Sequence, residues 1–254
     1  MAGDGRWRGH AAFATVRKGG EMKVFWLNVV GLCAAGLAMA RPMDIRTANL
    51  EPSRGGKPRP PVMVPPDVTN NVALNCPVTA SAETTAQDSP ERQTPLGDLP
   101  CLTDGNKEHD DERVNLPPGR QWVQIDLGRT REVWAVQIWH AYDYGCVYRD
   151  VVVLLSNDPG FSGETVTVFN NDHDNTSGLG EGKDKEYMED FMGRCLAVDG
   201  VFARYVRLYS NGCTETPVNR YTEIEVYGRM PVGHQPENGP RVPLKVGYPK
   251  PIFL

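Results

Sequence analysis

Residues 122–128 read WVQIDLG, and this stretch decides the fold. Val123, Ile125 and Leu127 alternate with the polar side chains of a glutamine and an aspartate. Successive side chains of a β-strand point to opposite faces, so an apolar residue at every second position makes one apolar face. The stretch therefore predicts a half-buried strand with its three apolar side chains in a core and its two polar ones opposite.

Further runs of this kind follow along the chain. The run EVWAVQIWH at 132–140 predicts a second strand with Trp134, Val136 and Ile138 on one face. VVVLL at 151–155 is apolar on both faces, which is typical of a central strand. The others are ETVTVF (164–169), ARYVRLYS (203–210, with Val206 and Leu208 inward) and EIEVYG (223–228, with Ile224 and Val226 inward). Short runs separated by turn residues predict an all-β sandwich.

The composition changes along the chain and suggests four segments. Residues 1–40 contain a misassigned start followed by MKVFWLNVVGLCAAGLAMA, which has the charge, apolar run and small-residue cleavage site of a secretory signal. The alternative is a membrane anchor, but the apolar run is shorter than the roughly 20 residues that span a bilayer. Residues 41–69 predict a Pro-rich extended linker, 70–229 one domain, and 230–254 an irregular tail. We expect a secreted, cell-surface or periplasmic protein without membrane insertion after signal cleavage.

The charge balance limits the possible partners. The 254 residues carry a formal net charge of −5, and removal of residues 1–40 leaves 22 basic and 30 acidic side chains. An acidic surface repels phosphate backbones, so nucleic acid is excluded as the expected partner. The acidic or hydroxyl-rich loops also disfavour anionic lipid.

Five signatures occur in a fixed order: NVALNCPVTAS (71–81), LTDGN (102–106), WVQIDLG, ARYVRLYSNG (203–212) and EIEVYG. In this order they resemble the discoidin or coagulation-factor 5/8 type C module of the galactose-binding-like superfamily, which is similar to fucose-binding lectins and family 32 carbohydrate-binding modules. The resemblance covers residues 70–228. It implies a single jelly-roll β-sandwich, with extended tails here, that presents a binding surface.

The acidic segment from Leu102 to Asn115 gathers carboxylate and amide oxygens around a glycine turn. Hard cations such as calcium bind six to eight oxygens, but a solvated acidic loop has the same composition. In the resembled lectins and modules this turn carries a structural calcium ion that joins the first and last strands. By position, the resemblance implies six ligands: the Cys101 carbonyl, Asp104, Asn106, an oxygen of Asn115, the Thr222 carbonyl and the Glu223 side chain.

A second candidate site is the segment WHAYDYGCVYRD at 139–150, which links two predicted strands. Sugar recognition uses an aromatic face together with charged or amide groups that bind hydroxyls in pairs. The predicted ligand-binding residues are Trp139, His140, Tyr142, Asp143, Tyr144 and Arg149. The alternative is that the aromatic residues pack under the loops. The segment lacks the Asn-Arg-x-Asp-Cys-Cys pattern of the fucose lectins, so the resemblance does not imply fucose.

The Gly-rich acidic segment 170–189 has three interpretations. It is a ligand loop, a second cation site or an acidic Ω-loop that caps the fold. The sequence does not separate these three.

Five cysteines follow residue 40, and in an exported protein they are disulfide candidates first. Their positions suggest pairs of Cys76 with Cys101 and of Cys146 with Cys213, which leaves Cys195 unpaired. No spacing indicates zinc.

The chain shows no sign of a catalytic site. It lacks the GxSxG and HExxH motifs, and paired carboxylates at unknown separation do not define a glycosidase. We therefore expect a secreted, non-catalytic module that binds carbohydrate and holds a structural calcium ion. The alternative is an extracellular protein-interaction or adhesion module without sugar binding, and a hydrolase is the third reading.

Overall fold

The computed structural model divides the chain into two compact units, residues 1–40 and 41–254. All described residues belong to the second unit: 49–54, 57–84, 97–108, 113–142, 145–231 and 239–248. The predicted signal segment lies outside them. No helix in these ranges is long and apolar enough to span a membrane.

The elements of this described part are short strands, three long strands and one 3-10 helix. In chain order they are β1 (Met63–Val64), β2 (Asn70–Asn71), β3 (Val78–Ala80), η1 (Leu99–Thr103), β4 (Val114–Leu116), β5 (Gln121–His140), β6 (Val152–Ser156), β7 (Thr165–Asn170), β8 (Arg194–Ser210), β9 (Asn219–Arg229) and β10 (Val242–Pro243).

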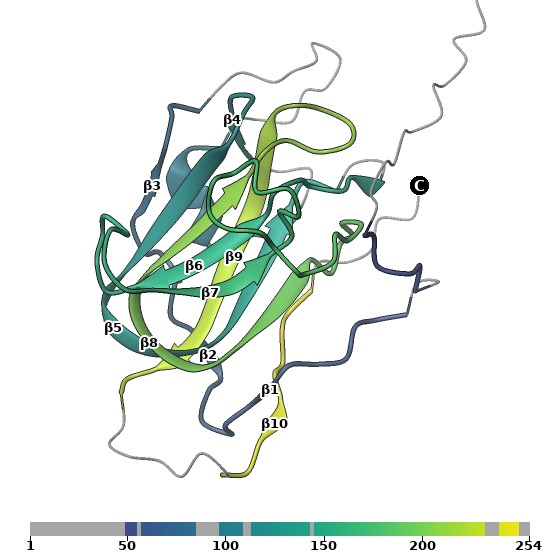
Figure 1. Cartoon of the computed structure of the whole chain (residues 1–254). Coiled ribbons are helices and arrows are strands. Elements are labelled where there is room, and N and C mark those ends of the chain that lie inside the picture. Colours follow the sequence, from purple (N-terminus) through teal and green to yellow (C-terminus); the bar gives the residue numbers. More distant parts are fainter. Residues whose placement is uncertain are drawn as a thin grey trace, which may run out of the picture. The chain divides into compact units, whose positions relative to one another are not determined.

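Strands β5 and β8 are bent, and Figure 1 shows them curving together. They pair antiparallel, and the pairing is interrupted between Asp126 and Arg131. Gly128 lies within the interruption with φ of 76°, a conformation that few residues other than glycine adopt. The runs at 122–128 and 132–140 are therefore two arms of one strand rather than two separate strands.

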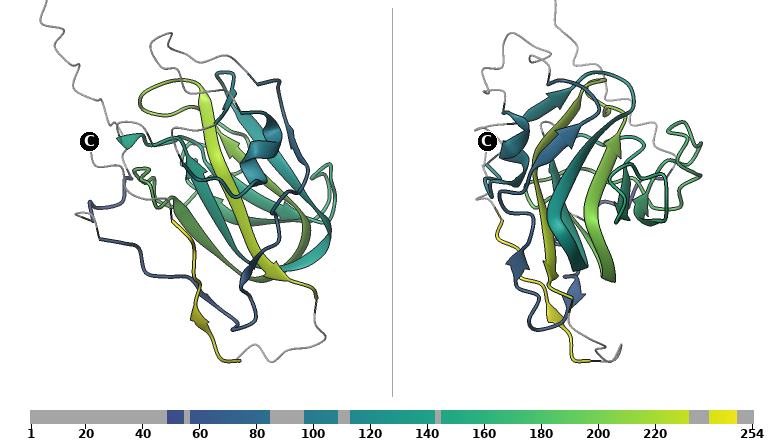
Figure 2. Two further views of the ribbon diagram at one scale, coloured as in Figure 1. Left: turned by 180° about the vertical axis from the view of Figure 1, so that it is seen from behind. Right: turned by 90° about the vertical axis from the view of Figure 1, so that its left-hand side faces the viewer.

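The bend lets both strands take part in two layers. One layer contains β3, residues 121–126 of β5, residues 205–210 of β8, β6 and β7. The other contains residues 194–203 of β8, residues 131–140 of β5, β9, and the short strands β2 and β4. All pairings are antiparallel, and Figure 2 shows the bent strands from two further sides. The chain is a jelly-roll β-sandwich, which confirms the predicted all-β class.

The core between the layers contains the predicted inward-facing residues. Val123, Ile125, Val206, Leu208, Ile224 and Val226 are all fully buried. Strand β6 pairs with both β7 and β8, so the prediction of a central strand is confirmed. Its other face forms a smaller cluster with Tyr209.

The predicted orientation of Trp134 is wrong. Between Val133 and Ala135 the register shifts, and Trp134 has no partner residue on β9. An extra residue in one strand changes which face the following side chains point to. Val133 and Val136 therefore face the main core, whereas Trp134 packs on the outer side of the layer.

Segments on both sides of the predicted domain pack against that outer side. Val64, Val68 and Leu244 are buried with Trp134 and Tyr227. Figure 2 shows β1 and β10 side by side, and the two strands are paired. Residues predicted as a linker and a tail thus cover an apolar face, because the bulge turned a tryptophan toward them.

Candidate functional site

The turn at 104–106 contacts β9 as the predicted cation site requires. The amide of Gly105 donates to Glu223 Oε1 at 3.2 Å. Gly105 has φ of +87°, and within the turn the Asn106 amide donates to Asp104 Oδ1 at 2.7 Å. The side chain of Glu223 thereby joins two segments that are far apart in the sequence.

The environment of Glu223 disfavours the ionised form of its carboxyl group. Its side chain is fully buried, and Oε2 has no hydrogen-bond partner among the described residues. Burial, together with the carboxylates of Glu225 and Asp104, raises the pKa of Glu223 to about 9 against the opposite effects of Gly105 and Lys107. A divalent cation beside such a group would offset the cost of burying its charge.

Three other predicted ligands are buried on or near the same strand. Asn115 lies on β4, which pairs with β9, and neither atom of its amide has a partner in the described part of the chain. Thr222 has no partner residue on β5 because the register shifts there. Cys101 lies in η1, whose residues contact β9. Unpaired buried oxygens of this chemistry fit a hard cation such as calcium.

Sequence reasoning missed the neighbour of this site, Lys107. Its Nζ is 2.8 Å from Glu225 Oε1 and lies 5.3 Å from the ring centroid of Trp139. Lys107 directly follows the LTDGN signature, but the neighbouring residues in the sequence do not indicate that it contacts Glu225 and Trp139.

Trp139 and His140 do not form an exposed binding rim. Both are fully buried at the end of β5, where the strand pairs with β9. Trp139 Nε1 donates to the Phe191 carbonyl at 3.1 Å. His140 Nδ1 is hydrogen-bonded to Glu189 Oε1 at 2.6 Å. The alternative interpretation, in which aromatic side chains pack under the loops, holds for Trp139.

The other predicted rim residues have different positions. Asp143 and Tyr144 lie outside the described residues, and Tyr142 is half-buried. Arg149 is exposed, and its guanidinium has no hydrogen-bond partner among the described residues. Of the described members of this set, Arg149 lines an open pocket.

We call that pocket the loop-end pocket. Its volume is about 400 Å³, and it lies between the β8–β9 loop, the β4–β5 turn and the loop after β5. It is lined by Gly119, Arg149, Asn211, Cys213, Thr214, Glu215, Thr216 and Pro217. Except for Arg149 and Cys213, sequence reasoning did not assign these residues, because they are small polar residues of ordinary turns.

The 170–189 segment is held by its own polar groups. Asp172 is fully buried and accepts hydrogen bonds from the Thr176 amide and from Ser177. Acceptor oxygens of Asp150, Asp172 and Asp174 lie within 4.8 Å of one another. Asp150 also accepts from Asn211 Nδ2 at 2.8 Å, which ties this segment to the loop-end pocket.

The structure brings together one of the two predicted cysteine pairs. The thiols of Cys146 and Cys213 are hydrogen-bonded to each other in the core. Cys76 Sγ donates to the Val72 carbonyl at 3.4 Å, and the side chain of Cys101 lies against Gly97. Disulfide pairing stays a prediction for both pairs.

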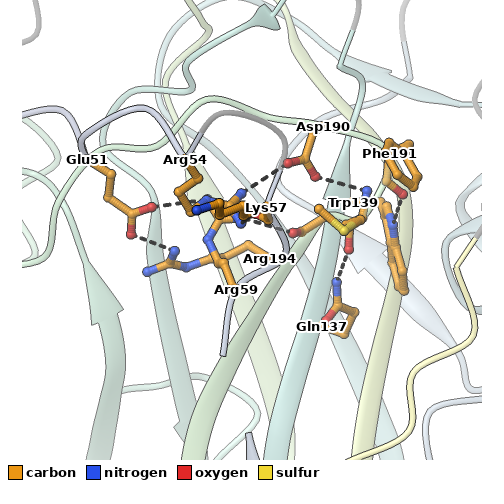
Figure 3. A network of polar contacts seen from close by, with 11 residues as sticks. Glu51, Arg54, Lys57, Arg59, Gln137, Trp139, Asp190, Phe191 and Arg194 are labelled. Atoms are coloured by element: carbon orange, nitrogen blue, oxygen red, sulfur yellow. Dashed lines mark hydrogen bonds and ion pairs between the residues drawn. The ribbon is translucent and has the colours of Figure 1, made fainter. Parts of the chain in front are cut away.

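A segment that we call the N-terminal strap, residues 49–54 and 57–60, contacts the second layer through ion pairs (Figure 3). Glu51 binds Arg194 at 2.6 Å and Arg59 at 3.2 Å, and Arg54 binds Asp190 at 3.1 Å. Burial raises the pKa of Glu51, but the two guanidinium groups outweigh it and lower the pKa overall. The strap fixes the part of the 170–193 loop that covers Trp139.

The comparisons with known proteins found matches among solved structures. No family model matches the chain, and neither does any curated protein. Similar solved structures include a family 89 glycoside hydrolase from Clostridium perfringens, with 17% identity, a TM-score of 0.45, and coverage of 63% of this chain and 14% of that one.

Two further similar structures are binding modules. Chitosan-binding module 1 of a chitosanase/glucanase from Paenibacillus sp. IK-5 has 22% identity and a TM-score of 0.41, and the match covers 63% of this chain and 99% of that one. The CBM32 of AlyQ has 21% identity and a TM-score of 0.40, with coverage of 61% and 96%.

Proposed function

We propose that this chain is a non-catalytic binding module whose ligand is a carbohydrate and whose binding surface is the loop-end pocket. The main support is the exposed guanidinium of Arg149, which lines a pocket of about 400 Å³ at one end of the sandwich. Ligand pockets have volumes of roughly 300–1,000 Å³ and use a few fixed polar groups.

The pocket offers several kinds of hydrogen-bonding group to a hydroxylated ring. The guanidinium of Arg149 donates in a planar fork, Glu215 accepts, and Asn211 and the threonine hydroxyls supply neutral partners. Its described lining residues include no aromatic side chain. The proposed binding therefore depends on hydrogen bonds to hydroxyls more than on stacking.

We further propose that calcium occupies the site formed by Asp104, Asn106 and Glu223, together with Asn115 and the carbonyls of Cys101 and Thr222. The support is the buried, unpaired oxygen of Glu223 and the unpaired amide of Asn115. The ion would hold η1 against β9, and its role would be structural.

We also propose that the chain is exported and that its signal segment is cleaved after Ala40.

A second candidate is a protein-interaction or adhesion module without sugar binding. It is favoured by a separate pocket of about 430 Å³ where β6, β7 and β8 meet, at which Phe202 and Val166 are exposed. Exposed apolar side chains that lie together are typical of protein contacts.

A glycan array tests the first proposal with two arginine variants. We expect the full chain to bind a subset of glycans and Arg149→Ala to lower that binding at least tenfold. Arg129→Ala is the matched control, because Arg129 is equally exposed but lies at the bend of β5. Absence of glycan binding by the folded chain, with retention of extracellular proteins instead, would favour the second candidate.

A further inference from the structure

Cys146 and Cys213 join two loops that form the wall of the loop-end pocket. Cys146 follows β5 and is fully buried, while Cys213 lies between β8 and β9 and is 5% exposed. Backbone hydrogen bonds already connect the loops, from the Thr214 amide to the Val147 carbonyl at 3.0 Å and from the Arg149 amide to the Gly212 carbonyl at 3.0 Å. Of the two sulfurs, only that of Cys213 belongs to a residue lining the pocket.

A buried guanidinium stabilises negative charge at this pair. Arg220 on β9 is 2% exposed, and its Nη2 donates to Cys146 Sγ at 3.3 Å and to Cys213 Sγ at 3.8 Å. A thiolate next to an arginine is the reactive form of cysteine.

The two thiols differ in the direction of their pKa shifts. The hydrogen bond from the Cys146 thiol lowers the pKa of Cys213 to about 6 in spite of burial, and the amides of Glu215 and Thr216 and the charge of Arg220 act in the same direction. That hydrogen bond raises the pKa of Cys146. The other titratable groups that face the pair are the Glu215 carboxylate and the Tyr148 hydroxyl.

We propose that Cys213 is a thiol–disulfide exchange site for low-molecular-weight disulfides that enter through the loop-end pocket. The Cys213 thiolate attacks one sulfur of the external disulfide, forms a mixed disulfide and releases one thiolate. Cys146 then loses its proton and attacks Cys213 Sγ, which releases the second small thiol. Two protein thiols are oxidised to one disulfide, and one external disulfide is reduced to two thiols.

Two other cysteines have a thiol pKa that is shifted in the opposite direction. Burial raises the pKa of Cys195 to about 12 and also raises that of Cys76, so both are thiols at neutral pH. The proposal thus distinguishes Cys213 from Cys76 and Cys195. It does not depend on carbohydrate binding, because it concerns the pocket wall and not the ligand.

Glutathione disulfide, added to the reduced full chain and followed by peptide mass spectrometry, tests the assignment. We expect a Cys146–Cys213 disulfide in the wild type and a stable glutathione adduct on Cys213 in Cys146→Ser. In Cys213→Ser we expect no adduct on Cys146. Adducts formed equally on Cys76 or Cys195, or no adduct on Cys213 in a folded Cys146→Ser protein, overturn the proposal.

The pH profile of iodoacetamide labelling gives a second readout. A thiol of ordinary pKa, about 8.5, gains reactivity up to that pH, whereas Cys213 in the folded chain should reach a plateau near pH 7 and exceed the urea-unfolded chain about tenfold at pH 5.5. Arg220→Lys, which keeps the charge, should retain most of this difference. An identical profile for folded and unfolded protein contradicts the proposal even where Arg220 variants fail to fold.

Discussion

Asp158 is half-buried, and backbone amides hold its carboxyl group in the ionised form. Its Oδ1 accepts from the Gly160 amide at 3.0 Å, and its Oδ2 accepts from Ser162 at 2.9 Å and from Gly163 at 3.1 Å. These amides, with the Ser162 hydroxyl, lower the pKa of Asp158 to about 2. The charge of this residue is therefore set by the turn that it closes and not by a basic partner.

This pKa predicts a pH-dependent contribution to stability. Because the folded value is lower than the unfolded value of about 3.9, the contribution is complete above pH 4 and is lost as pH falls toward 2. Asp158→Asn should be less stable than the wild type at pH 6, and the difference should disappear near pH 2. Thermal melting at both pH values measures it, and a difference that does not change with pH contradicts the prediction.

Among the elements, the N-terminal strap depends on one carboxylate that serves two arginines. The side chains of Glu51, Arg59 and Arg194 are each between 16% and 22% exposed, so removing the carboxylate leaves two largely buried guanidinium groups without their partner. The loss of a partner by a buried charged group lowers the free energy of unfolding more than the loss of an ion pair on the surface.

We expect Glu51→Ala to lower the free energy of unfolding by about 1–2 kcal/mol. The matched control is Asp199→Asn, which removes the charge from a 2.6 Å pair between Arg241 and a carboxylate that is 66% exposed, suits the φ of 69° at this position, and should cost less than about 0.5 kcal/mol. Urea unfolding of the three proteins measures both changes. Equal effects of the two variants would show that the strap adds no stability.

The strands could be predicted because alternation is a local property of the sequence. The bulge at Trp134 could not, since one extra residue leaves composition and alternation almost unchanged but reverses the faces. The sequence predicts the end of this strand at His140, but it does not decide the burial of Trp139, which depends on a contact with Phe191, 52 residues along the chain. The proximity of Asp104 and Glu223 followed from resemblance, because a contact across 119 positions has no local signal.

At the scale of the whole molecule, the proposed calcium ion joins η1 to the last long strand of the sandwich. We expect calcium to raise the melting temperature and a chelator to lower it. At about 100 times the dissociation constant, a ligand adds roughly 2.7 kcal/mol, which is about 5–10 °C for a chain of this size.

The variants separate this effect from general destabilisation. Asp104→Asn should abolish the response to calcium, and Asp158→Asn should retain it, because Asp158 lies in the β6–β7 loop. The measurement is differential scanning calorimetry with and without chelator. A wild-type melting temperature that ignores the chelator contradicts the calcium proposal without affecting the glycan-binding one.

The bend shared by β5 and β8 has a consequence for how the protein comes apart. Both layers contain part of β5 and part of β8, so neither layer is formed from strands of its own alone. Unfolding of one layer would therefore disrupt two strands of the other, and a partly unfolded intermediate would lack stable contacts. The sandwich is built to melt in a single step.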